Sequence, residues 1–298
     1  MAFNWQTFKT RTLTAAIFVA VMLAGLLINR WTFFILFSAI HFGCWWEYQK
    51  LIGSIDNTYQ KISPLHKFGI MIIGWCGMVF FFVVNNFYID TGYTIQVLVA
   101  VILLLMLLLI LVSTKNFKSI LYSFLGLIYI SLPLALIMKM SIHEIVALDG
   151  EPPTSEIFFL LVPFAVLLIG CMWINDTMAY IVGSLIGKTP LTKISPKKTW
   201  EGTIGGIVLC TATVGLLFQY AINLPDEAKL APYHYYILPA IASIAGTFGD
   251  LFESKLKRMA GVKDSGHIMP GHGGFLDRFD SLLFAVPFVW LYVYLFMQ

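Results

Sequence analysis

The sequence predicts an all-helical polytopic membrane protein with about nine transmembrane helices. Of its 298 residues, 59% are hydrophobic and 12% are charged, whereas soluble domains carry about 25% charged residues. The apolar residues fall in runs of about 17–20, the length that a helix needs to cross a bilayer. All four cysteines lie inside apolar runs and none forms a C-x-x-C pair, so we expect neither a disulfide framework nor a thiolate zinc site.

The first elements are expected near the N-terminus. Residues 1–12 mix aromatic side chains with Lys9 and Arg11, a pattern typical of a short interfacial helix. The apolar run from Leu13 to Ile28 is longer than a signal-peptide core and lacks a small-residue cleavage site after it. We therefore expect this run to be the first membrane span.

The remaining spans follow from the apolar runs in chain order. The nine expected spans are roughly residues 13–28, 31–48, 68–84, 95–112, 119–138, 157–174, 203–222, 235–252 and 281–296. Glu47 is the only acid in the second span, and Pro133 should kink the fifth. The fourth is nearly all Leu, Ile and Val, as expected for a helix that faces lipid.

Positive charges predict the orientation. With the N-terminus in the cytoplasm, 16 of the 19 Lys and Arg residues fall on the cytoplasmic side and three on the other, as the positive-inside rule requires. An odd number of spans then puts the C-terminus on the opposite face. We expect one integral unit, with a multi-span region over residues 1–150 and a catalytic region with cytoplasmic loops over residues 151–298.

The stretch from Asp250 to Asp280 concentrates charge and glycine in an otherwise apolar chain. It holds five of the 16 Asp and Glu residues and five of the 19 Lys and Arg residues. Asp277 and Asp280 lie three residues apart and share a helix face, as do Asp250 and Ser254, four apart. Asp277 and Asp280 could instead be capping acids paired with Arg278, between them.

The three carboxylates Asp250, Asp277 and Asp280 favour Mg²⁺, which few carboxylates can hold together with waters and phosphates. The loop between them contains Lys263-Asp264-Ser265-Gly266, then Gly271-His272-Gly273-Gly274. Glycines there let backbone N–H groups point at phosphate oxygens. The histidines have no Cys or His partner at zinc-ligand spacing, so His272 is interpreted as a hydrogen-bond donor to a phosphate or as a loop-fixing group.

A second cluster runs from Asn175 to Gly202. Asp176 interrupts a long apolar run, and an intramembrane acid indicates a functional site unless it pairs with a lysine or caps a broken helix. Ser195-Pro196-Lys197-Lys198 leads into a helix N-terminus and could cradle an anion, although one of the lysines could serve as a topology signal. Glycines at 202, 205 and 206 allow close helix packing or close approach of a ligand.

These two clusters resemble the phosphatidate cytidylyltransferase (CDP-diacylglycerol synthase) family. The resemblance lies in the run S-K-L-K-R…K-D-S-G…M-P-G-H-G-G-F-L-D-R-F-D, which ends at Asp280, and in D-T-x-A-Y…G-K…S-P-K-K-T-W-E-G, which begins at Asp176. It covers about the C-terminal 125 residues, with Met269 where an Ile, Leu or Phe is expected. It implies the reaction CTP + phosphatidate → CDP-diacylglycerol + pyrophosphate, dependent on Mg²⁺ with Asp250 and Asp277 as metal ligands. It also implies an all-helical membrane fold, often dimeric, with a polar cavity open to the cytoplasm and to lipid.

The residues can be assigned roles on this basis. We expect catalytic roles for Asp250, Asp277, Lys255, Arg258, Lys263, Asp264, His272, Arg278 and Asp280. We expect substrate contacts from Asp176, Ser195, Lys197, Lys198, Ser254, Ser265, Gly273 and Gly274. A second monovalent or divalent cation could be held near Asp280 or Asp264. The expected partners are CTP, phosphatidate, membrane lipid and a second copy of the chain, with no nucleic acid. The expected location is a bacterial-type inner membrane, with the active site facing the cytoplasm.

Two other functions stay open at this point. A CTP-dependent lipid-alcohol kinase would use similar substrates but release CDP. A transporter would use Asp176 and Asp250 as midplane ion sites, although the acids cluster with cations and glycines at one face and no repeat is visible. The D-G-x-x-A-R motif of CDP-alcohol phosphotransferases is absent.

Overall fold

The computed structural model describes residues 5–87, 104, 106–107, 114, 116–141, 163–222, 225–226, 229–266 and 273–297. These residues form helices and no strand; an isolated bridge pairs Pro190 with Thr199. The expected span at 95–112 falls almost entirely outside the described residues. The helices of the first half are α1 (Trp5–Leu27), α2 (Arg30–Ile55), α3 (Asn57–Gln60), α4 (Pro64–Phe87), α6 (Phe117–Gly126) and α7 (Leu132–Met140). Those of the second half are α9 (Phe164–Ile186), α10 (Trp200–Leu216), α11 (His234–Met259) and α12 (Leu276–Phe296).

The chain is an α-helical membrane protein. Six helical segments within the described ranges are long and apolar enough to cross a bilayer: 64–84, 117–140, 164–186, 200–221, 234–259 and 276–296. They match six of the expected spans. The apolar part of α1, residues 12–27, is shorter, and α2 is a helix that does not meet the same criteria. The count of nine spans and the orientation of the termini stay predictions.

Two helices differ from the expected boundaries. The interfacial segment and the first span form one continuous helix, α1, because neither proline nor glycine separates them. The span expected at 157–174 is α9, which begins after Pro163 and runs on to Ile186. Asp176 therefore lies in the middle of an unbroken helix, and the alternative that it caps a broken helix is wrong.

The chain groups into two compact units. The first contains residues 1–135 and 256–279, and the second contains residues 136–255 and 280–298. The loop that follows α11 and the first turn of α12 thus belong with the N-terminal helices. The expected functional division near residue 150 stays a prediction.

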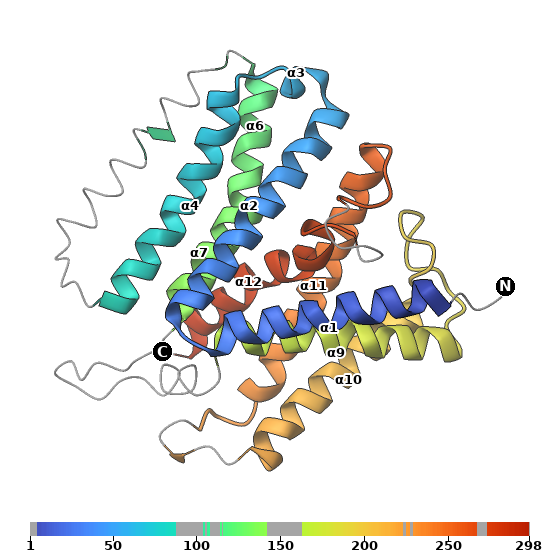
Figure 1. Ribbon diagram of the computed structural model, residues 1–298. Helices are drawn as coiled ribbons and strands as arrows, with labels where there is room; N and C mark the ends of the chain where they lie inside the picture. The colour runs from blue at the N-terminus through green and yellow to red at the C-terminus, as the bar shows by residue number, and fades with distance from the viewer. Residues whose placement is uncertain are drawn as a thin grey trace. The chain divides into compact units, whose positions relative to one another are not determined.

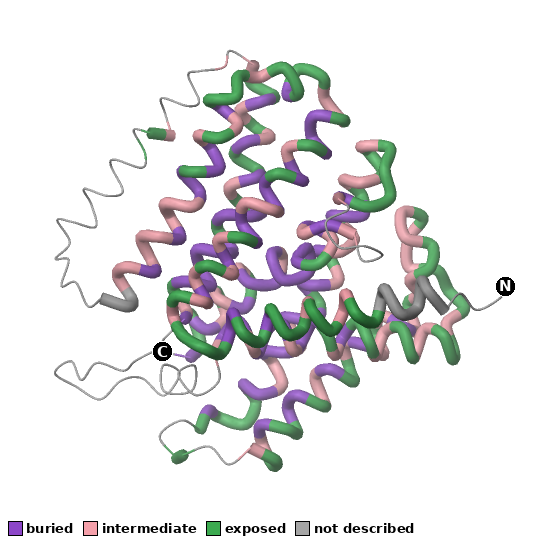
Figure 2. The backbone as a smooth tube through the Cα atoms, in the orientation of Figure 1, coloured by how far each residue is buried: buried purple, intermediate pink, exposed green. Residues whose placement is uncertain are grey.

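In the first unit, α2 packs against α4 and α6, which lie beside it (Figure 1). Its buried residues recur every three or four positions, from Phe33 and Phe37 to Leu51 and Ile52, which is the spacing of one helix face. Figure 2 shows this buried face along α2. Trp45 is fully buried there, and its indole N–H donates to Ser131 Oγ at 2.9 Å.

The helix that contains Pro133 changes its hydrogen-bond register just before the proline. Residues Leu127–Ser131 form a π-helical turn, in which the Leu132 N–H donates to the Leu127 carbonyl. Proline has no N–H and its ring clashes with the preceding turn, so a wider turn placed ahead of it accommodates the ring. The kink expected at Pro133 stays a prediction, and the structure shows a π-turn just ahead of the proline.

In the second unit, α9 and α10 lie side by side (Figure 1). Glycines make this close approach possible. A Cβ at Gly202 would lie 2.7 Å from the Ala179 carbonyl oxygen, and one at Gly206 would lie 2.8 Å from the Asn175 carbonyl oxygen. Close helix packing is therefore confirmed at both glycines, and Gly202 also lines a cavity.

Gly249 plays the same part where α11 meets α12. A Cβ there would lie 2.6 Å from the Asp280 carbonyl oxygen and 2.6 Å from Phe284 Cβ. Gly170, also helical and in the same unit, has nothing within 4 Å of such a Cβ. Gly249 and Gly170 therefore form a matched pair for testing the effect of an added methyl group.

We predict that Gly249→Ala destabilises the protein by about 1–3 kcal/mol, because backbone must move to admit the methyl group. Gly170→Ala should instead be neutral or stabilising by up to about 1 kcal/mol, because alanine is the better helix former. Thermal unfolding midpoints of the two variants in detergent test this. Equal midpoints would contradict the packing described for Gly249.

Candidate functional site

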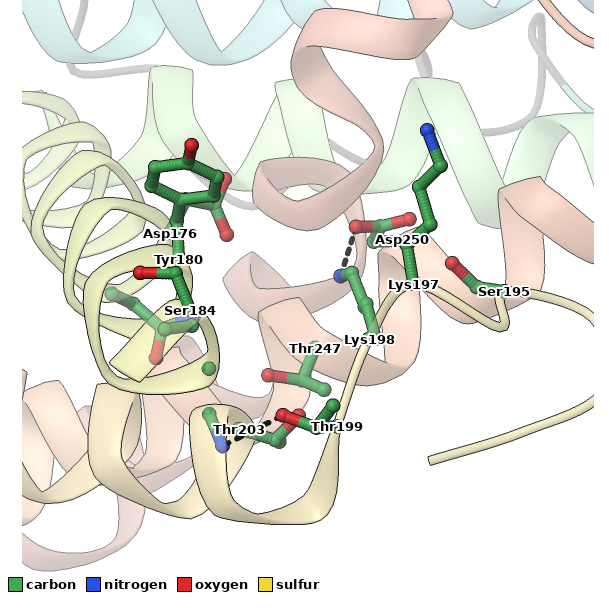
Figure 3. A pocket seen from close by; sticks show the side chains of 14 residues that line it. Asp176, Tyr180, Ser184, Ser195, Lys197, Lys198, Thr199, Thr203, Thr247 and Asp250 are labelled. Carbon is green, nitrogen blue, oxygen red and sulfur yellow. Dashed lines mark hydrogen bonds and ion pairs between the residues drawn. The ribbon is translucent and has the colours of Figure 1, made fainter. Parts of the chain in front are cut away.

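A polar cavity of about 460 Å³ opens in the second unit, within the range of small-molecule sites. Helices α9, α10 and α11 and the loop from 187 to 199 line it. Its polar lining residues are Asn175, Asp176, Tyr180, Ser184, Ser195, Lys197, Lys198, Thr199, Thr203, Thr247 and Asp250. In Figure 3, Asp176 and Tyr180 lie on one side of the cavity and Lys198 and Asp250 on the other.

The loop that carries the lysines is shaped by local hydrogen bonds. Thr199 caps α10 by accepting from the Gly202 N–H at 3.1 Å. Glu201, in the first turn of α10, accepts from the backbone N–H groups of Lys188 and Thr189 at 3.2 Å. The Leu191 N–H also donates to the Lys198 carbonyl at 2.7 Å. These bonds close the loop into a hairpin-like turn and hold Lys198 at the cavity.

Lys198 and Asp250 form an ion pair in the cavity wall (Figure 3). Their side chains are 30% and 27% exposed, so water reaches both groups. The Ser254 hydroxyl donates to the other carboxylate oxygen of Asp250 at 3.2 Å, which confirms that the two residues share a helix face. The structure thus joins Asp250 and Ser254 of the first motif to Lys198 of the second.

Three other residues of the second motif line the cavity with this pair, and they differ in their exposure to solvent. Asp176 and Lys197 are exposed and Ser195 is half-buried. All three line the same cavity. The structure therefore brings the sequence-predicted residues Asp176, Ser195, Lys197, Lys198 and Asp250 together, and the cavity presents two ammonium groups and two carboxylates to a ligand.

Asp277 has its own set of partners in the first unit. Its Oδ2 accepts from the Ser265 N–H at 2.9 Å, the Ser265 hydroxyl at 2.9 Å and the Gly274 N–H at 2.8 Å. Its Oδ1 accepts from Lys257 Nζ at 2.6 Å. Gly273 has a φ of +84°, which favours glycine, and any Cβ there would meet Asp277 Oδ2 at 2.5 Å. Ser265, Gly273 and Gly274, predicted to bind substrate, thus gather around Asp277.

Sequence reasoning missed two residues of this cluster. Lys257 is the cation that pairs with Asp277, with side chains 12% and 9% exposed, whereas Lys255 and Arg258 on either side of it had been predicted. Glu47 accepts hydrogen bonds from Ser265, Phe275 and Leu276. A sequence signal for Glu47 existed, because it is the single acid in its apolar segment and such acids indicate function. No sequence signal separated Lys257 from its neighbours.

The other predicted residues lie further from these contacts or outside the described residues. Lys255, Lys263, Asp264 and Arg278 are exposed. Exposed Arg258 donates to the Val262 carbonyl at 3.0 Å, closing the end of α11. Asp280 is 7% exposed and accepts from the Ser281 N–H. His272 lies outside the described residues. The catalytic and binding roles of the whole set stay predictions.

The acids of the two clusters are the candidate ligands for Mg²⁺. The described residues contain no group of three or more His, Cys, Asp or Glu side chains placed to hold a metal. Mg²⁺ usually takes one or two carboxylates and completes its shell with water and phosphate. Asp250, water-accessible and already beside a hydroxyl and an ammonium group, suits such a site. Both oxygens are engaged in each acid, so Asp250 would have to exchange Lys198 for a metal and Asp277 would have to exchange Lys257.

The fold and the cavity define a helical membrane protein with a polar, phosphate-compatible pocket. The chain matches the cytidylyltransferase family over residues 9–296. It therefore belongs to that family.

Curated relatives carry a more specific name. The phosphatidate cytidylyltransferase of Bacillus subtilis is 48% identical over 127 residues, which are 42% of this chain and 45% of the relative. The chloroplastic phosphatidate cytidylyltransferase 4 of Arabidopsis thaliana is 50% identical over 111 residues, 37% of this chain and 27% of the relative. The Synechocystis phosphatidate cytidylyltransferase is 42% identical over 132 residues, 44% of this chain and 43% of the relative. The matched part thus spans less than half of each relative.

Proposed function

We propose that the protein is a phosphatidate cytidylyltransferase, which converts CTP and phosphatidate to CDP-diacylglycerol and pyrophosphate. The observation that carries the proposal is the cavity in which Lys198 pairs with Asp250, within a membrane protein of the cytidylyltransferase family. The names of the curated relatives support the same reaction.

The chemistry requires charge neutralisation and no protein nucleophile. A phosphate oxygen of phosphatidate forms a bond to the α-phosphorus of CTP, and the bond from that phosphorus to the bridging oxygen of the β-phosphate breaks. The electron pair leaves with pyrophosphate. The barrier comes from bringing two anions together and from charge developing on the leaving group, and fixed cations lower both.

The residues of the cavity supply such cations. Lys198 and Lys197 would bind the triphosphate or the lipid phosphate, and Ser195 and Ser254 would add hydroxyl donors. Asp250 holds Lys198 in place until substrate arrives. Asp176, across the cavity (Figure 3), would orient a lysine or the nucleotide.

We propose Mg²⁺ as the cofactor, with Asp250 and Asp277 as its protein ligands. When bound, the ion would neutralise phosphate oxygens and so help pyrophosphate to leave. Asp280 or Asp264 would serve a second cation. Asp277 already lies among donors that orient it, and Lys257 pairs with it until the ion binds.

The remaining assignments also belong to this proposal. The active site would face the cytoplasm of a bacterial-type inner membrane, where CTP is available, and the enzyme would be a homodimer with no nucleic-acid partner. The positive-inside distribution of Lys and Arg supports the orientation.

Purified protein in detergent or vesicles should convert phosphatidate only with CTP among the nucleoside triphosphates, and only with Mg²⁺. Radiolabelled CMP should appear in the lipid, and one pyrophosphate should be released per lipid. Release of CDP would support the lipid-alcohol kinase instead. Transport of an ion without lipid turnover would support the transporter.

Lys198→Gln should lower kcat/KM for CTP by about 30-fold, because one charge-assisted contact to phosphate is worth about 2 kcal/mol. Lys193→Gln is the matched control, since Lys193 is an exposed lysine of the same loop that does not line the cavity. Steady-state kinetics at saturating phosphatidate measures both. Equal effects of the two variants would contradict the role assigned to Lys198.

Asp277→Asn should abolish detectable turnover while the thermal unfolding midpoint shows that the protein stays folded, because an amide is a far weaker ligand for Mg²⁺ than a carboxylate. Asp226→Asn, at an exposed acid paired with Lys229, controls for the loss of one negative charge. An Asp277→Asn enzyme that keeps half of its activity would rule out Asp277 as a metal ligand.

A further inference from the structure

Glu47 of α2 makes hydrogen bonds to a segment more than 200 residues further along the chain. Its side chain is buried, at 2% exposure. Glu47 Oε1 accepts from the Phe275 N–H at 2.9 Å. Its Oε2 accepts from the Leu276 N–H at 2.8 Å and from the Ser265 hydroxyl at 2.6 Å. Glu47 and its three partners belong to the first compact unit.

Two of these donors stand at the start of α12. The first N–H groups of a helix have no partner within the helix, and a carboxylate there also interacts favourably with the helix dipole. Glu47 therefore acts as a cap for α12 that is supplied from α2. Asp277 is the next residue after Leu276, so this cap fixes the turn from which Asp277 projects.

Ser265 links the two carboxylates. Its hydroxyl lies 2.6 Å from Glu47 Oε2 and 2.9 Å from Asp277 Oδ2. A serine hydroxyl has a single proton, which these two acceptors share. The Ser265 N–H also donates to Asp277. A shift of Glu47 would therefore move Ser265, and with it two of the donors that orient Asp277.

The neighbouring glycines leave space for the Glu47 carboxylate. A Cβ at Gly266 or at Gly274 would overlap it, so both positions admit the carboxylate because they lack a side chain. Phe275 in turn fills the space beside Gly43 on α2, where a Cβ would meet its ring. The loop and the first turn of α12 are thus built around one acid of α2.

We propose that Glu47 is a positioning residue for the reaction: it holds Ser265 and the first turn of α12 so that Asp277 keeps the orientation needed for turnover. This inference rests on the proposed function of the site. It adds to that function a residue from the N-terminal half of the chain, outside both motifs on which the family resemblance rests.

Glu47→Gln is the sharpest test, because it is nearly isosteric but turns one acceptor into an NH₂ group that faces N–H or O–H donors. A small misplacement of a reacting group can cost about 10²-fold in rate. We expect kcat to fall by about that factor, KM for CTP to change less than threefold, and the Mg²⁺ concentration for half-maximal activity to rise. Hydrogen–deuterium exchange of residues 263–280 should increase.

Ser131→Ala is the matched control. Ser131 is buried in the same unit and bonds to Trp45 and His41, so its loss also removes buried hydrogen bonds of α2. It should lower the unfolding midpoint without changing the Mg²⁺ requirement or the exchange of residues 263–280. Glu47→Asp keeps both acceptor oxygens on a shorter side chain and should retain more activity than Glu47→Gln. It replaces Glu47→Gln as the test variant if Glu47→Gln fails to fold.

The outcomes separate this inference from the proposed function. An inactive wild-type enzyme would overturn the proposed function and the role of Glu47 with it. An active wild type with Glu47→Gln at unchanged kcat and Mg²⁺ requirement would overturn the role of Glu47 alone, as would an unchanged Glu47→Asp where Glu47→Gln does not fold. Equal kinetic losses in Ser131→Ala and Glu47→Gln would also overturn it, because they would reflect general destabilisation.

Discussion

The hydrogen bonds of Glu47 are the constraint on which the first unit depends. A buried carboxylate is costly unless its oxygens find donors, and those of Glu47 find them in the Ser265 hydroxyl and the N–H groups of Phe275 and Leu276. The dependence runs both ways, because the N–H groups of Phe275 and Leu276 would lose this acceptor without the acid. One side chain of α2 therefore ties the start of α12 and the preceding loop to the N-terminal helices, which explains why residues 256–279 group with them.

The two half-buried acids of the motifs share one electrostatic arrangement. Asp250 pairs with Lys198, and Asp277 pairs with Lys257. In a chain with 12% charged residues, an acid inside the protein needs a nearby cation or hydrogen-bond donors, since charge is poorly solvated there. The same pairing suits phosphate chemistry, because an ammonium group released from its carboxylate can neutralise an incoming anion. Resting stability and substrate binding thus use the same side chains.

The glycines show why a motif does not disclose its own geometry. Gly273 and Gly274 suggested a phosphate cradle, yet here the Gly274 N–H donates to Asp277 and a Cβ at Gly274 would overlap Glu47. Gly202 and Gly206 allowed either a ligand or a helix, and α9 lies against them. A glycine in the sequence allows a close approach to the backbone; whether one occurs, and by which atom, is decided by packing.

The sequence by itself determined the class and most of the helices, because span length and hydropathy are local properties imposed by the bilayer. Local spacing also placed Asp250 and Ser254 on one helix face, which their hydrogen bond confirms. The motifs predicted that Asp176, Lys198 and Asp250 would lie in one site. They did not predict that Lys198 would pair with Asp250. That Lys257, and neither Lys255 nor Arg258, reaches Asp277 depends on the rotation of α11. That Glu47 caps α12 depends on a contact across more than 220 residues, and only the tertiary structure decides such contacts.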